Sequence, residues 1–339
     1  MKQGTVRAGQ AIALLLAGDC TLLLTLGGSR ALLCALPCAL AAGAVLLLPL
    51  GTLLARGSSF YAPKWLQRAI NAPLAVYLLT ESACAAAALG NFSARTELSV
   101  DRTHALLPLV LLAALYGAWL GLESAARTAG LLIVPLAAGL CVIVLLLRGE
   151  LRVQNILPAP LVPQSEVMDA LRVFWSTLGS SGALLLAFRP YIQQYRARHT
   201  ACWLLAEGGA TALIAFAVCA VLGEGNALLS LPFYTASLTA SPEVALRPEG
   251  IFTAMMTVGV YMRCTAFLLG FALCIKSLCP AQLQRAALPV GAGAALVLAL
   301  FLRTSPEAVT LANALRWVPA VLFCVICPLL LLCQRGARS

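Results

Sequence analysis

Four charged side chains lie inside apolar runs that are long enough to cross a membrane. They are Asp19 in LLAGDCTLLL, Glu81 in LLTESACAA, Glu207 in LLAEGGA and Arg263 in VYMRCTAF. A charge at the centre of a membrane helix costs about 2.5 to 3.5 kcal/mol on insertion scales, so each of these residues needs a partner or a function. Asp19 can accept the ammonium of a bound amino acid, coordinate a cation or carry a proton. It can also simply tie two helices together through a buried partner such as Arg263.

Small polar residues surround two mid-helix positions, AGDCT at 17–21 and STLGSSGA at 176–183. Such residues are common where membrane helices approach closely, so they fit ordinary packing as well as a binding site. Thr257 and Tyr261 are four residues apart and share a helical face, on which they can line a pocket or pack. The candidate ligand-binding residues are Gly18, Asp19, Thr21, Glu81, Thr177, Gly179, Ser180, Ser181, Gly182, Thr257 and Tyr261.

The sequence offers little for catalysis or metal binding. The chain has 13 cysteines, but most lie in apolar runs, and the one CxxC pair, in CVIC at 324–327, has no second pair near it. The two histidines, His104 and His199, lie at expected membrane edges, away from any zinc-like spacing. We therefore expect no metal, no cofactor and no enzyme activity.

Composition indicates the setting in which these residues act. Hydrophobic residues make up 61% of the 339 positions and charged residues only 11%, which is too apolar for an ordinary soluble fold. Apolar stretches of about 20 residues predict membrane helices, and the fold class is therefore an all-α polytopic membrane protein. We expect ten spans, at about 9–28, 31–55, 69–90, 104–121, 127–147, 171–189, 200–222, 250–275, 286–303 and 312–333.

Charge indicates orientation and partners. The segments between spans hold more Lys and Arg on one side, and the bias places both termini in the cytoplasm. The first apolar run has no convincing cleavage site and is interrupted by Asp19, so we expect a helix there and not a signal peptide. A formal net charge of +10 suits an anionic bilayer surface, and we expect the lipid bilayer as a partner but no nucleic acid.

A long polar segment from Arg148 to Asp169 divides the chain into two halves of five spans each. Each half opens with one of the small-residue helices, as in transporters built from inverted repeats whose first helices are broken. We expect one integral membrane domain, with residues 1–150 as the first repeat and 151–339 as the second.

Two regions resemble the spore germination permease family, which supplies the B subunit of germinant receptors in endospore-forming bacteria. GLESAARTAG at 121–130, followed by LRVQNILPAP at 151–160, is similar to the family's signature between helices four and five. VLGEGNALLSLPFYTASL at 221–238 and LRPEGIFTAMM at 246–256 are similar to a second family pattern. The first match rests on Gly121, Glu123, Arg127, Asn155, Leu157 and Pro158. Met256 departs from the tryptophan common in the family, and TLGSSGA departs from its more apolar sixth helix.

The resemblance implies the amino acid–polyamine–organocation superfamily and the fold of the leucine transporter. It implies a small germinant, such as an amino acid, bound between broken helices one and six and helices three and eight. It also implies partner A and C receptor subunits and the spore inner membrane, within a bacterial cell. A proton- or sodium-coupled amino-acid transporter of the same fold is the alternative.

Four further residues are assigned structural or coupling roles: Glu123, Arg127, Glu249 and Arg263. Glu123 and Arg127 have the i, i+4 spacing of a helical ion pair, which can brace the turn between helices four and five or meet a partner subunit. Arg263 needs an acidic partner, which the sequence does not identify.

Overall fold

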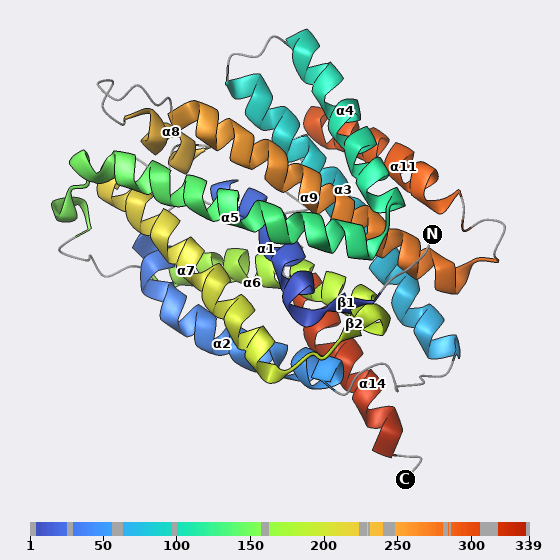
Figure 1. Ribbon diagram of the computed structural model, residues 1–339. Coiled ribbons are helices and arrows are strands. Elements are labelled where there is room, and N and C mark those ends of the chain that lie inside the picture. The colour runs from blue at the N-terminus through green and yellow to red at the C-terminus, as the bar shows by residue number, and fades with distance from the viewer. Residues whose placement is uncertain are drawn as a thin grey trace.

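The computed structural model describes residues 5–25, 30–55, 64–96, 100–156, 163–223, 229, 231–239, 248–280, 284, 286–305 and 318–336. Eight of the described helices are long and apolar enough to cross a membrane. The chain is therefore an all-α, multi-pass membrane protein (Figure 1). Every long helix satisfies its backbone hydrogen bonds internally, as hydrocarbon surroundings require.

The long helices follow the expected spans closely. They are α1 (Ala8–Thr25), α2 (Arg30–Ala55), α3 (Lys64–Arg95), α5 (Leu122–Leu146), α6 (Gln164–Phe188), α7 (Ala197–Leu222), α9 (Pro248–Leu278) and α11 (Ala287–Thr304). Several extend beyond the expected ends by one or two turns, because polar residues at membrane edges continue a helix that hydropathy alone would end.

The two remaining expected spans are shorter apolar helices. Within α4 (Val100–Trp119) the apolar part is Leu106–Trp119, and near the C-terminus it is Val318–Cys333. The latter combines α13 (Val318–Val321), the π-helical turn η5 (Leu322–Ile326) and α14 (Cys327–Gly336). Residues 312–317 of the predicted last span lie outside the described residues.

Short elements between the long helices were not predicted. Helix α8 (Pro232–Leu238) lies between α7 and α9, and the 3-10 turns are η1 (Leu147–Gly149), η2 (Val153–Asn155) and η3 (Arg189–Tyr191). Strand β1 (Val6–Arg7), just before α1, pairs in parallel with β2 (Ile192–Gln193), just after α6 and η3. The pairing places the start of α1 beside the end of α6, so these two helices run in opposite directions.

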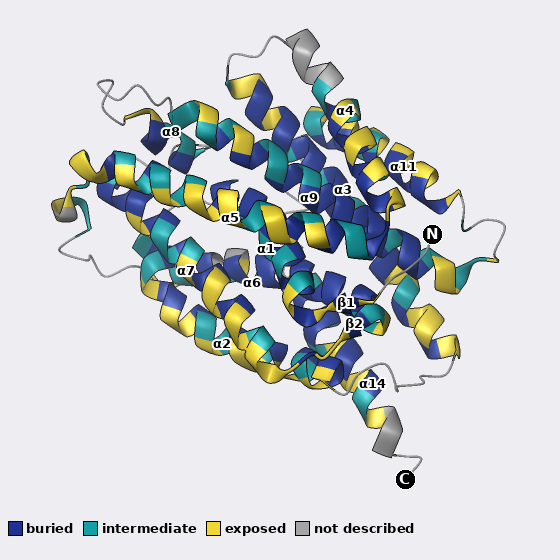
Figure 2. Ribbon diagram, viewed as in Figure 1, coloured by how far each residue is buried: buried dark blue, intermediate teal, exposed yellow. Residues whose placement is uncertain are grey.

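Helices α6 and α9 form the interior of the bundle. In their most apolar windows 76% and 78% of residues are buried, against 17% for α5. Figure 2 shows this contrast, with much of α9 dark blue and exposed yellow residues along α5 and α2. Helix α9 packs against α1, α3, α4 and α5, and any charge on its buried face must find its partner inside the bundle.

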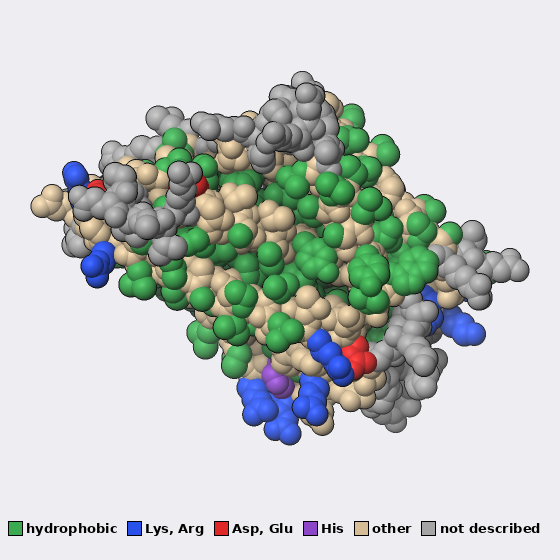
Figure 3. Space-filling model, turned by 45° about the horizontal axis from the view of Figure 1, so that its top comes forward, with side chains coloured by type: hydrophobic (Ala, Val, Ile, Leu, Met, Phe, Trp, Pro, Cys, Tyr) green, Lys and Arg blue, Asp and Glu red, His purple; other side chains and the backbone are tan. Residues whose placement is uncertain are grey.

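The outer surface is apolar where a bilayer would surround it. Large hydrophobic side chains are well exposed, among them Leu131, Val297, Tyr116 and Trp65. Figure 3 shows hydrophobic side chains across the middle of one face, with Lys and Arg nearer its edges. This distribution is the one expected for contact with lipid chains and flanking headgroups.

The expectation that helices one and six are broken was wrong. Helix α1 continues through Gly18 and Asp19, and α6 continues through Gly179 and Ser181. Neither segment contains a proline, and a small residue needs no break when a neighbouring helix packs closely against it. The backbone N–H groups at these positions are therefore used within the helices.

Candidate functional site

Arg263 of α9 lies at the centre of a buried polar cluster. Its Nη1 donates to Asp19 Oδ1 at 2.8 Å, and its Nη2 donates to Glu81 Oε2 at 2.8 Å. The same Nη2 donates to Ser180 Oγ at 3.0 Å, while Ser181 Oγ donates to the second oxygen of Asp19. We call these five residues the Arg263 cluster. It joins α1, α3, α6 and α9.

The cluster is excluded from solvent. The side chains of Arg263, Asp19 and Glu81 are 1%, 2% and 5% exposed. The guanidinium carbon also lies 4.7 Å from the centre of the Phe267 ring, which adds a cation–π contact. Buried charges are tolerated when they are paired and hydrogen-bonded, and removing one partner is far more costly than removing an exposed pair.

Glycines bring α1 and α9 close enough for these contacts. A Cβ at Gly18 would lie 3.3 Å from the Cα of Arg263, and a Cβ at Gly259 would lie 2.6 Å from Thr21 Oγ1. Gly18 therefore acts through backbone approach, which lets the short Asp19 side chain reach the guanidinium. Thr21 Oγ1 is buried and has no hydrogen-bond partner among the described residues.

Two of the predicted ligand-binding glycines pack against the last helix instead of facing the cluster. A Cβ at Gly179 would lie 2.6 Å from the Cα of Ala320, and a Cβ at Gly182 would lie 2.3 Å from Cys324 Sγ. Positions 179 and 182 are three apart and share a face of α6. Their role in the structure is close helix packing, whereas the intervening Ser180 and Ser181 reach the cluster.

The predicted pair on α9 also lies elsewhere. The hydroxyl of Tyr261 would be 2.8 Å from a Cβ at Gly117, so it points toward α4. Thr257 Oγ1 donates to the backbone oxygen of Thr253. On α6, the backbone oxygen of Thr177 accepts the hydroxyl of Ser180. None of these three side chains is among the printed contacts of Arg263 described above.

Glu207 of α7 has an unusual environment. Its relative exposure is 0%, and neither carboxylate oxygen has a hydrogen-bond partner among the described residues. It is close enough to interact electrostatically with Asp19 and Arg263. It therefore borders the Arg263 cluster without joining its hydrogen bonds.

The residues assigned structural roles are placed as follows. Arg127 Nη2 donates to Glu123 Oε1 at 2.5 Å, with the side chains 68% and 44% exposed, so the predicted i, i+4 pair is confirmed. Asn155 Nδ2 donates to the backbone oxygen of Ala220, which ties the segment after α5 to α7. Glu249 lies in the first turn of α9. Leu157 and Pro158 lie outside the described residues.

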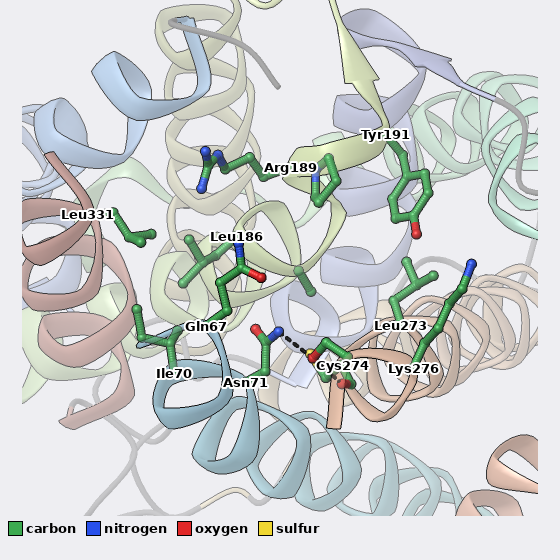
Figure 4. A pocket seen from close by; sticks show the side chains of 13 residues that line it. Gln67, Ile70, Asn71, Leu186, Arg189, Tyr191, Leu273, Cys274, Lys276 and Leu331 are labelled. Atoms are coloured by element: carbon green, nitrogen blue, oxygen red, sulfur yellow. Dashed lines mark hydrogen bonds between the residues drawn. The ribbon is translucent and has the colours of Figure 1, made fainter. Parts of the chain in front are cut away.

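A separate pocket of about 230 Å³ opens at one end of the same helices. Figure 4 shows Gln67 and Asn71 of α3 facing it, with Leu273, Cys274 and Lys276 from α9 and Arg189 and Tyr191 from η3 around it. Asn71 Nδ2 donates to Ser277 Oγ at 2.6 Å at its edge. The sequence gave no signal for this pocket, because its lining comes from the ends of helices far apart in the chain.

An apolar layer separates the pocket from the Arg263 cluster. A Cβ at Gly270 would lie 3.0 Å from Leu78 Cδ1 and 3.2 Å from Leu184 Cδ2. Along each of α3, α6 and α9, these residues come between the cluster positions and the pocket positions. The pocket and the cluster are thus stacked along one axis of the bundle, with leucines between them.

No protein-family model matches this chain. No curated protein matches it either. The functional argument therefore depends on the geometry of the Arg263 cluster and on the motifs described above.

Proposed function

We propose that the chain binds a small zwitterion, an amino acid in the first instance, at the Arg263 cluster. The observation that carries this proposal is the meeting of one guanidinium, two carboxylates and two hydroxyls from four helices at a buried point. These are the four helices between which a germinant pocket is expected by resemblance, because α9 is the eighth long helix of the chain.

The chemistry of the cluster matches a zwitterion. A ligand carboxylate can replace Asp19 or Glu81 as a partner of Arg263 through charge-assisted hydrogen bonds. The ligand ammonium can then pair with the displaced carboxylate, so that every charge keeps a partner after binding. Ser180 and Ser181 can accept from the ammonium or donate to the carboxylate.

The pattern of helix contacts supports a 5+5 inverted repeat of the leucine-transporter type. Helix α1 packs against α5, α7 and α9, and α6 packs against the last helix, α2 and α3. Exchanging each helix with its counterpart five spans away converts the first set of contacts into the second. The opposite directions of α1 and α6 agree with the inversion of one half relative to the other.

On this fold we propose that the chain is the B subunit of a spore germinant receptor. Binding at the cluster would change how α1 and α6 pack against α3 and α9 and would pass that change to A and C subunits in the spore inner membrane. The exposed Glu123–Arg127 pair, at the start of α5, is available to a partner subunit.

One observation favours the transporter alternative. The pocket in Figure 4 lies directly beyond the leucine layer from the cluster, on the side where α1 begins and α6 ends. Movement of that layer would connect the cluster to one side of the membrane, as solute transport requires.

The germinant response of spores tests the receptor proposal. Asp19→Asn keeps the side-chain size but removes the charge that would hold a ligand ammonium. We expect at least a tenfold rightward shift of the germinant dose response, with the protein present at its normal level. Glu166→Gln, which changes an exposed carboxylate at the start of α6, is the control and should respond normally. A normal response of the Asp19→Asn spores would contradict the proposal.

A further inference from the structure

Glu207 is the buried charge that the binding proposal leaves unused. Its side chain lies in the middle of α7 at 0% exposure, and both carboxylate oxygens lack hydrogen-bond partners among the described residues. Only its backbone oxygen has an extra bond, from Thr211 Oγ1 at 2.8 Å. Next to it, Leu40 of α2 packs against Gly208.

Each helix packed against α7 contributes few charges near this carboxylate. Helix α1 contributes Asp19 and the thiol of Cys20, and α9 contributes Arg263. The charged residue of α2 is Arg30, which lies at the end of that helix and donates to the backbone oxygen of Asn155. Helix α8 has no charged residue.

The charge balance of this region does not favour an ionised Glu207. Arg263 already bonds directly to both Asp19 and Glu81, so these three residues carry a net negative charge when ionised. A second uncompensated negative charge in an apolar interior would be very costly, and buried carboxyl groups in such places are neutralised instead. A metal cation is a poor alternative, because the nearby guanidinium would repel it.

We propose that Glu207 is a proton-binding site, neutral at neutral pH, whose proton is exchanged as the charges of the Arg263 cluster change. The proton requires no cavity and no further ligands. Its coupling to ligand binding rests on the proposed function, whereas the presence of the proton does not.

Infrared spectroscopy of the purified full chain in lipid nanodiscs tests the site without any ligand. A neutral carboxylic acid has a C=O stretch that an ionised carboxylate lacks. We expect this band in the wild type at neutral pH, its loss in Glu207→Gln and its retention in Glu166→Gln. Absence of the band from the wild type, or its persistence in Glu207→Gln, would overturn the proposal.

Thermal stability gives a second, independent measurement. Gln is a close match for a neutral Glu, so Glu207→Gln should melt like the wild type at neutral pH. As the pH rises, the wild type should lose stability relative to Glu207→Gln, because the unfolded chain releases the proton more readily than the folded chain. A variant that fails to fold, or a sodium-dependent stabilisation present only in the wild type, would show that the carboxylate is ionised and would overturn the proposal.

The coupling is tested by binding of labelled amino acids across a pH series. We expect binding by the wild type to change with pH and binding by Glu207→Gln to change at least threefold less. If the infrared result holds but binding is independent of pH, the coupling is wrong while the proposed function stands. If no amino acid binds at any pH, the proposed function fails while the proton site stands.

Discussion

Two ion pairs in this protein have similar distances but very different surroundings. Arg263 and its acidic partners are almost fully buried, whereas Arg127 and Glu123 are largely exposed. Exposed pairs contribute about 0.3 to 0.5 kcal/mol, while breaking a buried pair costs about 3 to 5 kcal/mol. Burial, more than contact distance, therefore decides which arginine the fold depends on.

We predict that Arg263→Gln destabilises the protein by about 3 to 5 kcal/mol, because it leaves two carboxylates buried without their cation. Arg127→Gln is the matched control and should cost less than about 1 kcal/mol. Thermal unfolding of both variants in the same detergent measures the difference. Equal stability of the two variants would mean that Arg263 is not paired as the structure shows.

At the residue level, the sequence identifies the charges but not their pairing. Asp19, Glu81, Glu207 and Arg263 are recognisable because each interrupts an apolar run. Which carboxylates meet Arg263 depends on helix rotation, and a span of hydrophobic residues all around its circumference gives no rotational signal. The structure selects Asp19 and Glu81 and leaves Glu207 without a hydrogen bond.

At the level of elements, small residues determine which helices touch. Gly179 and Gly182 were predicted to bind ligand, and they instead allow the last helix to pack against α6. Composition cannot separate these roles, because glycine serves close packing and ligand contact equally well. The helix spans were more predictable, since about 20 apolar residues leave few alternatives to a membrane helix.

We predict that Gly179→Ala destabilises the protein by about 1 to 3 kcal/mol, because the added methyl group would overlap the backbone of Ala320. Gly209→Ala is the control, since a Cβ there meets nothing within 4 Å. This control should be neutral or stabilising by up to about 1 kcal/mol, as expected for Gly to Ala in a helix. Melting curves of the two variants test the assignment, and an unaffected Gly179→Ala would argue against tight packing of α6 on α13.

At the level of the whole molecule, α4 leaves open how often the chain crosses the bilayer. Its apolar part, Leu106–Trp119, is shorter than the eight long helices. Two short helices packed within a bundle can still cross by tilting or by local bilayer thinning. The ten-span arrangement requires that both of them do so.

Reporter fusions test this arrangement. If α4 and α5 both cross, reporters fused after residues 98 and 149 will report the same side of the membrane. If α4 does not cross, they will report opposite sides. We predict the same side for these two fusions, and opposite sides for fusions after residue 305 and at the C-terminus. A fusion at the C-terminus should report the cytoplasm, as the distribution of basic residues predicts.

The central claim is that the Arg263 cluster binds a solute and that the chain senses this solute without carrying it. The most direct measurement uses the purified chain in liposomes, with a panel of labelled amino acids assayed both for binding and for accumulation under an imposed proton or sodium gradient. The account predicts saturable binding that Asp19→Asn weakens at least tenfold, with no accumulation. Gradient-driven accumulation would contradict the receptor function and identify a transporter, and binding unaffected by Asp19→Asn would contradict the site.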